Sequence, residues 1–200
     1  MSDFDQKARD WDSDPLKVER ARVTAAAIRS QVPLTRQTAA LEYGCGTGLL
    51  SFALQPYLGS IVLADNSGGM LEVLGEKIAA AGLANMTPVR LDLTADAIPP
   101  GQYRLIYMLM VLHHIPDTAA ILRKLHDMLE RPGILCIADL DEEDGSFHPA
   151  GFEGHHGFDQ EELRRQLLEA GFSRARSSVF FENPKNGRVY PLFLAVAEKR

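Results

Sequence analysis

The sequence predicts an α/β fold built on a mostly parallel sheet. From about residue 39 to residue 140, short apolar runs alternate with stretches in which apolar side chains recur at helical spacing. This alternation is typical of βαβ units, which place successive strands parallel in one sheet. Near the end of the chain, two extended runs flank a turn-rich segment that is too short for a crossover. The predicted sheet therefore ends with an antiparallel strand.

Seven strands are expected in all. Five are short apolar runs bounded by turn residues, and their unbroken apolarity indicates burial on both faces of the sheet. These five strands are expected at residues 40–43, 61–65, 86–92, 105–111 and 134–140. The last two strands, 178–182 and 190–199, flank the turn-rich segment 183–187 and are predicted to form a hairpin.

Capping residues mark the helices between these strands. Ser67, Asp117 and Asp159 each precede a periodic apolar stretch, and their side chains can accept hydrogen bonds from the first helical turn. Gly82 can end the first of these helices, because glycine readily adopts the left-handed conformation of a helix C-terminus. The segment 131–133, Arg-Pro-Gly, is expected to stop the second helix before the next strand begins.

A helix is also predicted ahead of the first strand. Asp14-Pro15 is a good helix start, because aspartate can cap the helix and proline fits its first turn, and Pro33 marks the end. The chain has no internal repeat, low-complexity tract or linker. Residues 1–200 are therefore expected to form a single domain, with residues 1–33 as an N-terminal helical extension.

Composition argues against several classes of protein. The 200 residues include 21 basic and 27 acidic ones, giving a net charge of −6 without a basic run, so nucleic-acid and anionic-membrane partners are not expected. The two cysteines, Cys45 and Cys136, lack the spacing of a zinc site and are too few for a disulfide framework. The N-terminus is acidic, unlike a secretory signal, and no apolar run approaches ~20 residues. These features predict a cytoplasmic protein.

A glycine-rich loop is expected to carry the chemistry. Gly44-Cys45-Gly46-Thr47-Gly48 lies where the first strand turns into a helix, and glycines let the backbone approach a ligand closely. A dinucleotide-binding loop needs its third glycine one residue later, where this chain has Leu49. This mismatch argues against the alternative of an NAD-dependent oxidoreductase, which should also lack the closing hairpin.

Two carboxylates follow the next strands at the same edge of the sheet. Asp65 lies 21 residues after Gly44, at the end of the second strand, where it can accept hydrogen bonds from both hydroxyls of a ribose. Asp92 lies just past the third strand. Open α/β proteins bind ligands at the carboxyl ends of their strands. We therefore expect three loops to converge on one crevice that binds an adenosine-containing ligand.

Taken in their order along the chain, these motifs resemble those of the class I S-adenosylmethionine-dependent methyltransferases. The similar segments are LEYGCGTGLLS, VLADNSGGML, LDLTADAIP and YRLIYMLMVLHHIPD, followed by Gly171-Phe172 and the closing hairpin. The resemblance implies a Rossmann-like sheet of seven strands in the order 3-2-1-4-5-7-6, the seventh antiparallel, with helices on both faces. It also implies an enzyme that uses S-adenosyl-L-methionine as methyl donor.

The resemblance further implies which residues bind the cofactor. The glycine loop would hold the methionine part, and Asp65 would hold the ribose. Asn66 would lie beside the adenine, Asp92 would face its exocyclic amine near the Leu93 backbone, and Met108 would contact the methionyl amine. The implied cofactor-binding residues are Gly44, Cys45, Gly46, Asp65, Asn66, Asp92, Leu93 and Met108.

The opening stretch FDQKARDWDSDPLKVERA resembles a segment that folds over the cofactor in this family. Residues 1–33 are therefore interpreted as an extension or a lid, with Phe4 and Trp11 as candidate lid residues. An aromatic ring near a sulfonium is favourable by roughly 0.5 to 2 kcal/mol. The alternative is that Trp11 only packs a surface helix onto the core.

The methyl acceptor is expected to be a small molecule, because the chain has no added recognition domain and no basic groove.

His114, after the fourth strand, and His156, in the loop 151–158, are candidate catalytic residues on the acceptor side, with a purely structural role as the alternative. A metal site built from this loop and the acidic run 139–144 is not expected, because adjacent histidines usually point in different directions. A non-catalytic module that binds S-adenosylmethionine or S-adenosylhomocysteine is a further alternative.

Overall fold

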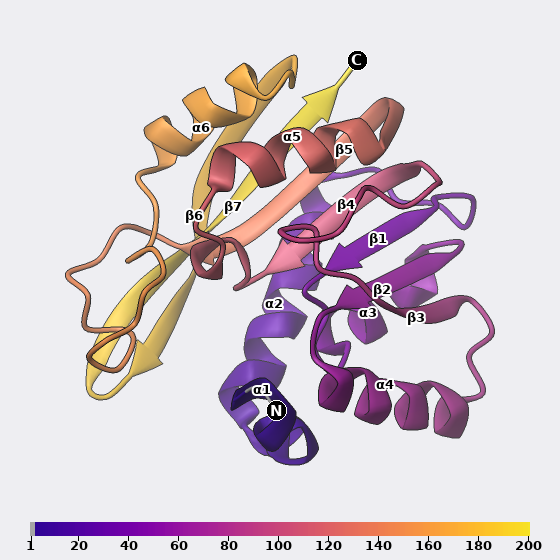
Figure 1. Cartoon of the computed structure of the whole chain (residues 1–200), viewed down its shortest axis with the longest axis horizontal. Coiled ribbons are helices and arrows are strands. Elements are labelled where there is room, and N and C mark those ends of the chain that lie inside the picture. Colours follow the sequence, from indigo (N-terminus) through magenta and orange to yellow (C-terminus); the bar gives the residue numbers. More distant parts are fainter. Residues whose placement is uncertain (1–2) are drawn as a thin grey trace.

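Seven strands form one sheet in the order β3-β2-β1-β4-β5-β7-β6 in the computed structural model, which describes residues 3–200 (Figure 1). The strands are β1 (Ala40–Tyr43), β2 (Ile61–Asp65), β3 (Met86–Arg90), β4 (Tyr103–Leu109), β5 (Leu129–Leu140), β6 (Arg174–Lys185) and β7 (Arg188–Lys199). Strands β1 to β5 pair in parallel, whereas β7 is antiparallel to both of its neighbours. The predicted strand order and antiparallel end are both confirmed.

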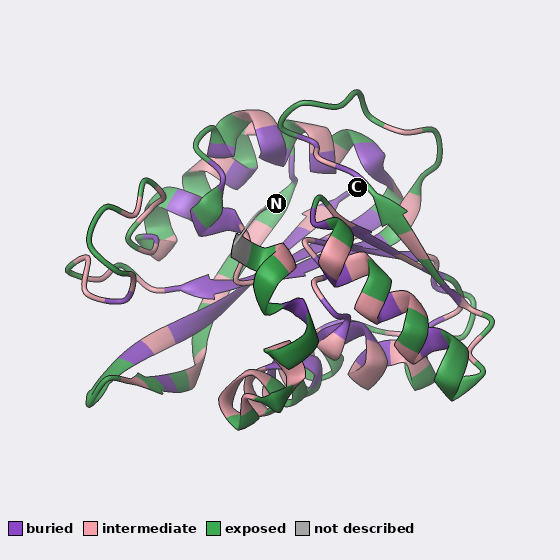
Figure 2. Ribbon diagram, turned by 60° about the horizontal axis from the view of Figure 1, so that its bottom comes forward, coloured by how far each residue is buried: buried purple, intermediate pink, exposed green. Residues whose placement is uncertain are grey.

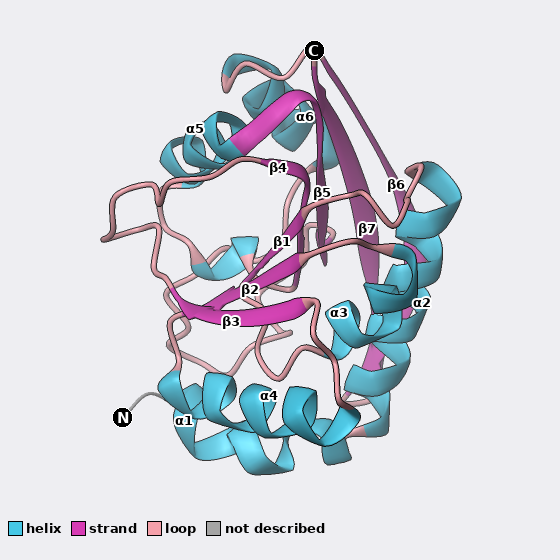
Figure 3. Ribbon diagram, turned by 90° about the vertical axis from the view of Figure 1, so that its right-hand side faces the viewer, coloured by secondary structure: helices cyan, strands magenta, loops and turns pink. Residues whose placement is uncertain are grey.

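Helices cover both faces of this sheet, as predicted. They are α1 (Asp3–Lys7), α2 (Pro15–Gln31), α3 (Leu49–Leu54), α4 (Gly68–Ala81), α5 (Thr118–Met128) and α6 (Gln160–Glu169), with short 3₁₀ helices η1 (Ala8–Ser13), η2 (Gln55–Tyr57) and η3 (Leu112–His114). Figure 3 shows α5 and α6 on one side of the strands and α2, α3 and α4 on the other. Figure 2 shows that the strands between them are largely buried, while the outer faces of the helices are exposed.

Two apolar cores result from this layering. One contains Leu125 of α5 and Leu163 of α6, and the other contains Ile28 of α2 and Leu74 of α4. Neighbouring residues of a strand belong to different cores, because side chains alternate across a sheet. In β4, for example, Leu105 and Tyr107 face the α2 side, and Ile106 and Met108 face the α5 side.

The predicted helix starts are confirmed. The Ser67 hydroxyl accepts a hydrogen bond from the backbone N–H of Met70 at 3.2 Å, at the start of α4. Asp117 and Asp159 accept equivalent bonds at 2.9 and 2.8 Å at the starts of α5 and α6. Gly82 ends α4 with a φ of 62°. These side chains satisfy backbone N–H groups that have no partner within the helix.

Several strand boundaries differ from the prediction, including the end of β3, which is Arg90 and not residue 92. The segment 131–133 does not stop a helix but lies inside β5, which begins at Leu129. An irregularity in the pairing of β5 with β4 falls between Leu129 and Ile134, and such a bulge lets a strand accommodate Pro132. Strand β4 ends at Leu109 and not at residue 111, because Met110 adopts a φ of 58°.

The closing hairpin is longer than predicted. Strand β6 extends to Lys185, and only Asn186 and Gly187 form the turn, with φ of 52° and 75°. An Asn-Gly pair with two positive φ angles matches the right-handed twist of the flanking strands. Asn183 and Lys185, expected in a loop, therefore lie on a strand that borders the candidate site described below.

The N-terminal segment is helical from α1 to α2. Of the predicted extension 1–33, the first two residues lie outside the described residues. None of the helices from residue 3 onwards combines the length and the apolar composition that crossing a bilayer requires.

Candidate active site

A cavity of about 860 Å³ opens where strands β1, β2 and β4 end. This volume is typical of ligand-binding pockets, which measure roughly 300 to 1,000 Å³. The loops after these strands form its floor, helices α1 and α2 form one wall, and β6 and the segment between β5 and α6 close the far end. The structure brings five of the predicted cofactor positions to this cavity: Gly44, Gly46, Asp65, Asn66 and Asp92.

The two cavity glycines have different reasons to lack a side chain. Both have positive φ, 70° at Gly44 and 52° at Gly46. A Cβ on Gly44 would lie 2.4 Å from the Val111 side chain, so this glycine is needed for close packing between two loops. A Cβ on Gly46 would meet nothing closer than the Met70 sulfur and the Trp11 ring nitrogen, both at 3.9 Å. The absent side chain of Gly46 thus leaves space inside the cavity.

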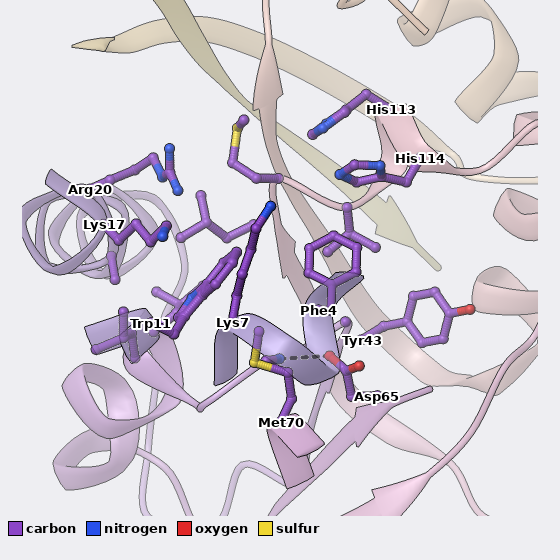
Figure 4. A pocket seen from close by; sticks show the side chains of 18 of the residues that line it. Phe4, Lys7, Trp11, Lys17, Arg20, Tyr43, Asp65, Met70, His113 and His114 are labelled. Atoms are coloured by element: carbon purple, nitrogen blue, oxygen red, sulfur yellow. Dashed lines mark hydrogen bonds between the residues drawn. The ribbon is translucent and has the colours of Figure 1, made fainter. Parts of the chain in front are cut away.

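Asp65 joins the glycine loop to the start of α4. One carboxylate oxygen accepts a hydrogen bond from the Gly46 N–H at 2.7 Å (Figure 4), and the other accepts one from the Ser67 N–H at 2.9 Å. Burial raises the pKa of Asp65, although these two bonds oppose the increase. A carboxylate has about four acceptor positions, so roughly two remain for a ligand.

Asn66 and Asp92 form the adjoining corner of the cavity. The Asn66 amide donates to Asp92 at 3.4 Å, and the Thr94 hydroxyl donates to the other Asp92 oxygen at 2.6 Å. The bond from Thr94 is the main cause of a lowered Asp92 pKa. Asp92 is therefore an acceptor at neutral pH, available to a ligand amine.

Three predicted cofactor positions do not line the cavity. Cys45 and Leu93 are buried, and the Leu93 N–H already donates to the Tyr43 hydroxyl at 3.0 Å. Met108 is fully buried and packs in the α5-side core. The cavity is lined instead by Leu109, the last residue of β4, and by Met110, whose positive φ of 58° breaks the alternation of the strand.

Glu42 is a buried acid that sequence reasoning missed. It lies on β1 at the cavity floor and accepts a hydrogen bond from Ser51, whose hydroxyl is 2.6 Å from that of Tyr107. Burial raises the pKa of Glu42 to about 8, so the side chain is largely protonated at neutral pH. The signal available in the sequence for this buried acid was a charged residue inside an otherwise apolar strand.

The N-terminal segment is fastened over the cavity. Asp5 accepts hydrogen bonds from the Ser67 hydroxyl at 2.6 Å and from the Gly69 N–H at 3.0 Å. Asp12 forms an ion pair with Lys77 at 2.5 Å. Helix α1 and η1 are thereby held against α4, directly beside the glycine loop.

Two aromatic side chains of this segment line the cavity (Figure 4). The rings of Phe4 and Trp11 meet edge to face with centroids 5.9 Å apart. Phe4 also contacts the His114 ring at 5.6 Å, and the Lys17 ammonium lies 3.9 Å from the centre of the Trp11 ring. The N-terminal segment thus reaches from the glycine loop to the histidines beyond β4.

Three histidines form the opposite part of the wall. His113 is almost fully buried, and its Nδ1 lies 2.6 Å from the Asp139 carboxylate. His114 and His148 face the cavity, and their rings are 4.1 and 5.1 Å from that of His113. Removal of water, and then the neighbouring His113, lowers the pKa of both His114 and His148 to about 4. Both rings are therefore neutral at pH 7 and able to accept a hydrogen bond.

The loop 151–158 contributes differently from the prediction. His156 does not line the cavity; it is half exposed, with Nδ1 3.6 Å from Glu143. The His155 N–H donates to the His113 carbonyl at 2.8 Å, which pins the loop and turns the next side chain outward. Phe152 lines the cavity, stacked 3.7 Å from His148.

The three histidines also have the composition of a metal site. One ring nitrogen from each of His113, His114 and His148 lies within 4.8 Å of the other two, and imidazole nitrogen is a common ligand of Zn²⁺ and related ions. The sequence predicted no metal site. His148 is 34 residues away from His114 in the chain, so no short motif signals this group.

Fold and site together define a Rossmann-like α/β protein with a nucleotide-sized cavity at the carboxyl edge of its sheet. A profile described as a methyltransferase domain matches residues 40–133. An uncharacterized methyltransferase of Schizosaccharomyces pombe is 29% identical over 151 residues, which are 68% of this chain and 53% of that protein. A trans-aconitate 2-methyltransferase of Agrobacterium fabrum is 34% identical over 125 residues, 61% of this chain and 46% of its own length.

Solved structures agree with this result. A SAM-dependent methyltransferase from Aquifex aeolicus superposes with a TM-score of 0.74 at 19% identity, over 97% of each chain, which shows a common fold. The chain is thus similar to methyltransferases in sequence over residues 40–133, and it shares the fold of an S-adenosylmethionine-dependent methyltransferase. It spans about half the length of the two sequence relatives named above.

Proposed function

We propose that the protein binds S-adenosylmethionine in this cavity and transfers its methyl group to a small-molecule acceptor. The observation that carries the proposal is the hydrogen bond from the Gly46 N–H to Asp65 at 2.7 Å. It holds a carboxylate with spare acceptor positions next to a side-chain-free loop, as a ribose beside a methionyl chain requires. The similarity to methyltransferases in sequence and fold supports the same cofactor.

The cofactor would lie along the floor of the cavity. Gly44 and Gly46 would contact the methionyl part, Asp65 the ribose hydroxyls, and Asn66 and Asp92 the adenine. Phe4 and Trp11 would cover the cofactor from above, so residues 1–33 are proposed to act as a lid. The support for the lid is the set of contacts that tie Asp5 and Asp12 to α4.

S-adenosylmethionine supplies a methyl group on a positively charged sulfur, which is a good leaving group. The protein then has to align the acceptor with that group and exclude water, and such positioning can contribute up to roughly 7 to 11 kcal/mol. Phe4, Trp11 and Phe152 provide apolar walls for this purpose. If the acceptor is a hydroxyl, its proton passes to a base as the new bond to carbon forms.

His114 is proposed as the residue that receives or orients this proton. It faces the cavity, and its low pKa keeps the ring neutral. Asp139 cannot serve directly, because it is fully buried and bonded to His113. Asp139 instead positions His113, which borders the same part of the cavity.

Calorimetry tests the cofactor, and turnover tests the reaction. We expect S-adenosylmethionine and S-adenosylhomocysteine to bind much more tightly than NAD. Tight binding of NAD without affinity for either methionine-derived ligand would disprove the proposal. Transfer of a labelled methyl group to a small acceptor would separate an enzyme from a non-catalytic module that binds the same cofactor.

A further inference from the structure

One wall of the cavity is strongly basic, although the chain has a net charge of −6. Lys7, Lys17, Arg20 and Lys185 all line it, from α1, α2 and β6. Figure 4 shows Arg20 and Lys17 reaching in from α2, on the side opposite the two labelled histidines, with Lys7 between the two sides. The basic wall therefore faces the part of the cavity that we assign to the acceptor.

Arg20 is held in this wall without an ion-pair partner among residues 3–200. Burial lowers the pKa of its guanidinium, and the more distant carboxylates of Asp14 and Asp139 only partly oppose this effect. The one hydrogen bond of the guanidinium to the described chain runs to the Asn183 side chain at 3.3 Å, and Nε has no partner there. Even a partly buried charge is costly unless it is paired, so a partner from outside the chain would stabilise Arg20.

Asn183 and Lys185 of β6 also have hydrogen-bond donors that the described chain leaves unused. Asn183 is 1% exposed, and its amide nitrogen has no hydrogen-bond partner within the described residues. Lys185 donates to the Phe147 carbonyl at 2.5 Å, which leaves two of its three N–H donors. Burial lowers the pKa of Lys185, followed by repulsion from Arg20. Two neighbouring cations and a spare amide donor form a site complementary to an anion.

We propose that Arg20, Asn183 and Lys185 form a subsite that binds an oxyanion of the methyl acceptor, either a carboxylate or a phosphate monoester. This inference rests on the proposed methyltransferase function. A guanidinium matches the two oxygens of such groups with parallel hydrogen bonds, and the amide and ammonium add further donors.

The position of the subsite favours the acceptor over the cofactor. Lys185 lies 3.8 Å from the centre of the Phe147 ring, and Phe147 contacts His148 at 4.9 Å. The charge of Lys185 also contributes to the lowered pKa of His148. The charge of Asp139, the partner of His113, acts on the pKa of Arg20. The subsite thus adjoins the histidines, whereas Asp65 and Asp92 follow β2 and β3, at the other end of the sheet order.

Matched charged and neutral probes test the subsite. Benzoate, phenyl phosphate and the neutral benzamide are titrated calorimetrically into the protein saturated with S-adenosylhomocysteine, and into the protein alone. We expect benzoate or phenyl phosphate to bind at least tenfold more tightly than benzamide, and the preferred anion identifies the acceptor group. This preference should fall below threefold in Arg20→Gln and in Lys185→Gln. Arg22→Gln is the control, since Arg22 lies on the same helix but pairs with Glu19 at the surface.

Other outcomes overturn the inference or the function separately. Equal binding of the anions and benzamide to the native protein would overturn the subsite. If Arg20→Gln weakens S-adenosylhomocysteine tenfold but leaves 5′-methylthioadenosine, which lacks the carboxylate, unchanged, then the anion is that of the cofactor and the acceptor assignment is wrong. Failure of S-adenosylhomocysteine to bind the native protein would contradict the function, while the titrations without it still report the anion site. Should Arg20→Gln not fold, Lys185→Gln decides alone.

Discussion

The two halves of the cavity differ in how their polar groups are satisfied. On the cofactor side, Asp65 has a partner for each of its oxygens and Asp92 is bonded to Asn66 and Thr94. On the acceptor side, by contrast, four buried polar atoms have no partner in the described chain: Arg20 Nε, His113 Nε2, His148 Nε2 and Asn183 Nδ2. Buried polar groups are normally hydrogen-bonded. The half proposed for the cofactor therefore has its polar groups bonded within the chain, whereas the half proposed for the acceptor leaves polar atoms that a ligand would satisfy.

The largest effect is expected on the acceptor half. Replacing His114 by Ala should lower turnover by roughly 100- to 10,000-fold if the ring handles a proton, while affinity for S-adenosylmethionine stays nearly unchanged. His156→Ala is a matched control, because His156 lies outside the cavity. Steady-state kinetics and calorimetry measure the two quantities. A loss of cofactor binding in His114→Ala would mean that the two halves are not separate.

A smaller effect is expected on the cofactor half. Asp65→Ala should weaken S-adenosylhomocysteine by about 1.5 to 3 kcal/mol for each charged hydrogen bond to the ribose, or roughly 10- to 150-fold. Adenine alone, which lacks the ribose, provides the control ligand and should be affected less. Unchanged affinity for S-adenosylhomocysteine in a folded Asp65→Ala protein would show that the ribose binds elsewhere.

The pH dependence of stability tests the buried network beneath both halves. The pKa of Glu42 is about 8 in the folded protein and near 4.5 when unfolded, so the folded state binds more protons between these values. Stability from this group is present below pH 4.5 and is lost as the pH rises towards 8. Glu42→Gln should therefore gain stability relative to the native protein between about pH 5 and about pH 8, on the order of 1 to 3 kcal/mol. Thermal unfolding at several pH values measures the difference in stability between the two proteins. A difference that does not change with pH would contradict this prediction.

The smallest effect is expected from removal of metal ions. The sequence predicted no metal, and His114 can act as a neutral imidazole without one. Dialysis against EDTA should then change turnover by less than about twofold, which corresponds to about 0.4 kcal/mol in activation free energy. Loss of activity that Zn²⁺ restores, and that His148→Ala abolishes, would show instead that the three histidines bind a metal ion.

Local signals in the sequence determined most of the cofactor half. The glycine loop, Asp65 and the Ser67 cap lie within 24 residues, and each follows from a strand end or a helix start. Hydrogen-bond geometry at such ends depends on residues that are close in the sequence, so it can be predicted from a single sequence. The same reasoning did not show that Met108 lies outside the cavity, because only the observed end of β4 determines which of its side chains face the cavity.

Only the tertiary structure decided the acceptor half. His148 joins His113 from a loop 35 residues away, and Arg20 meets Asn183 across 163 residues of chain. No periodicity or motif connects such positions. Their contact follows from where α2 packs and from the extent of the β6–β7 pairing, which carries Asn183 into a strand that the sequence predicted to be a turn. Long-range pairing is set by the packing of the whole sheet, and this is why the residues proposed to recognise the acceptor could not be derived from local sequence.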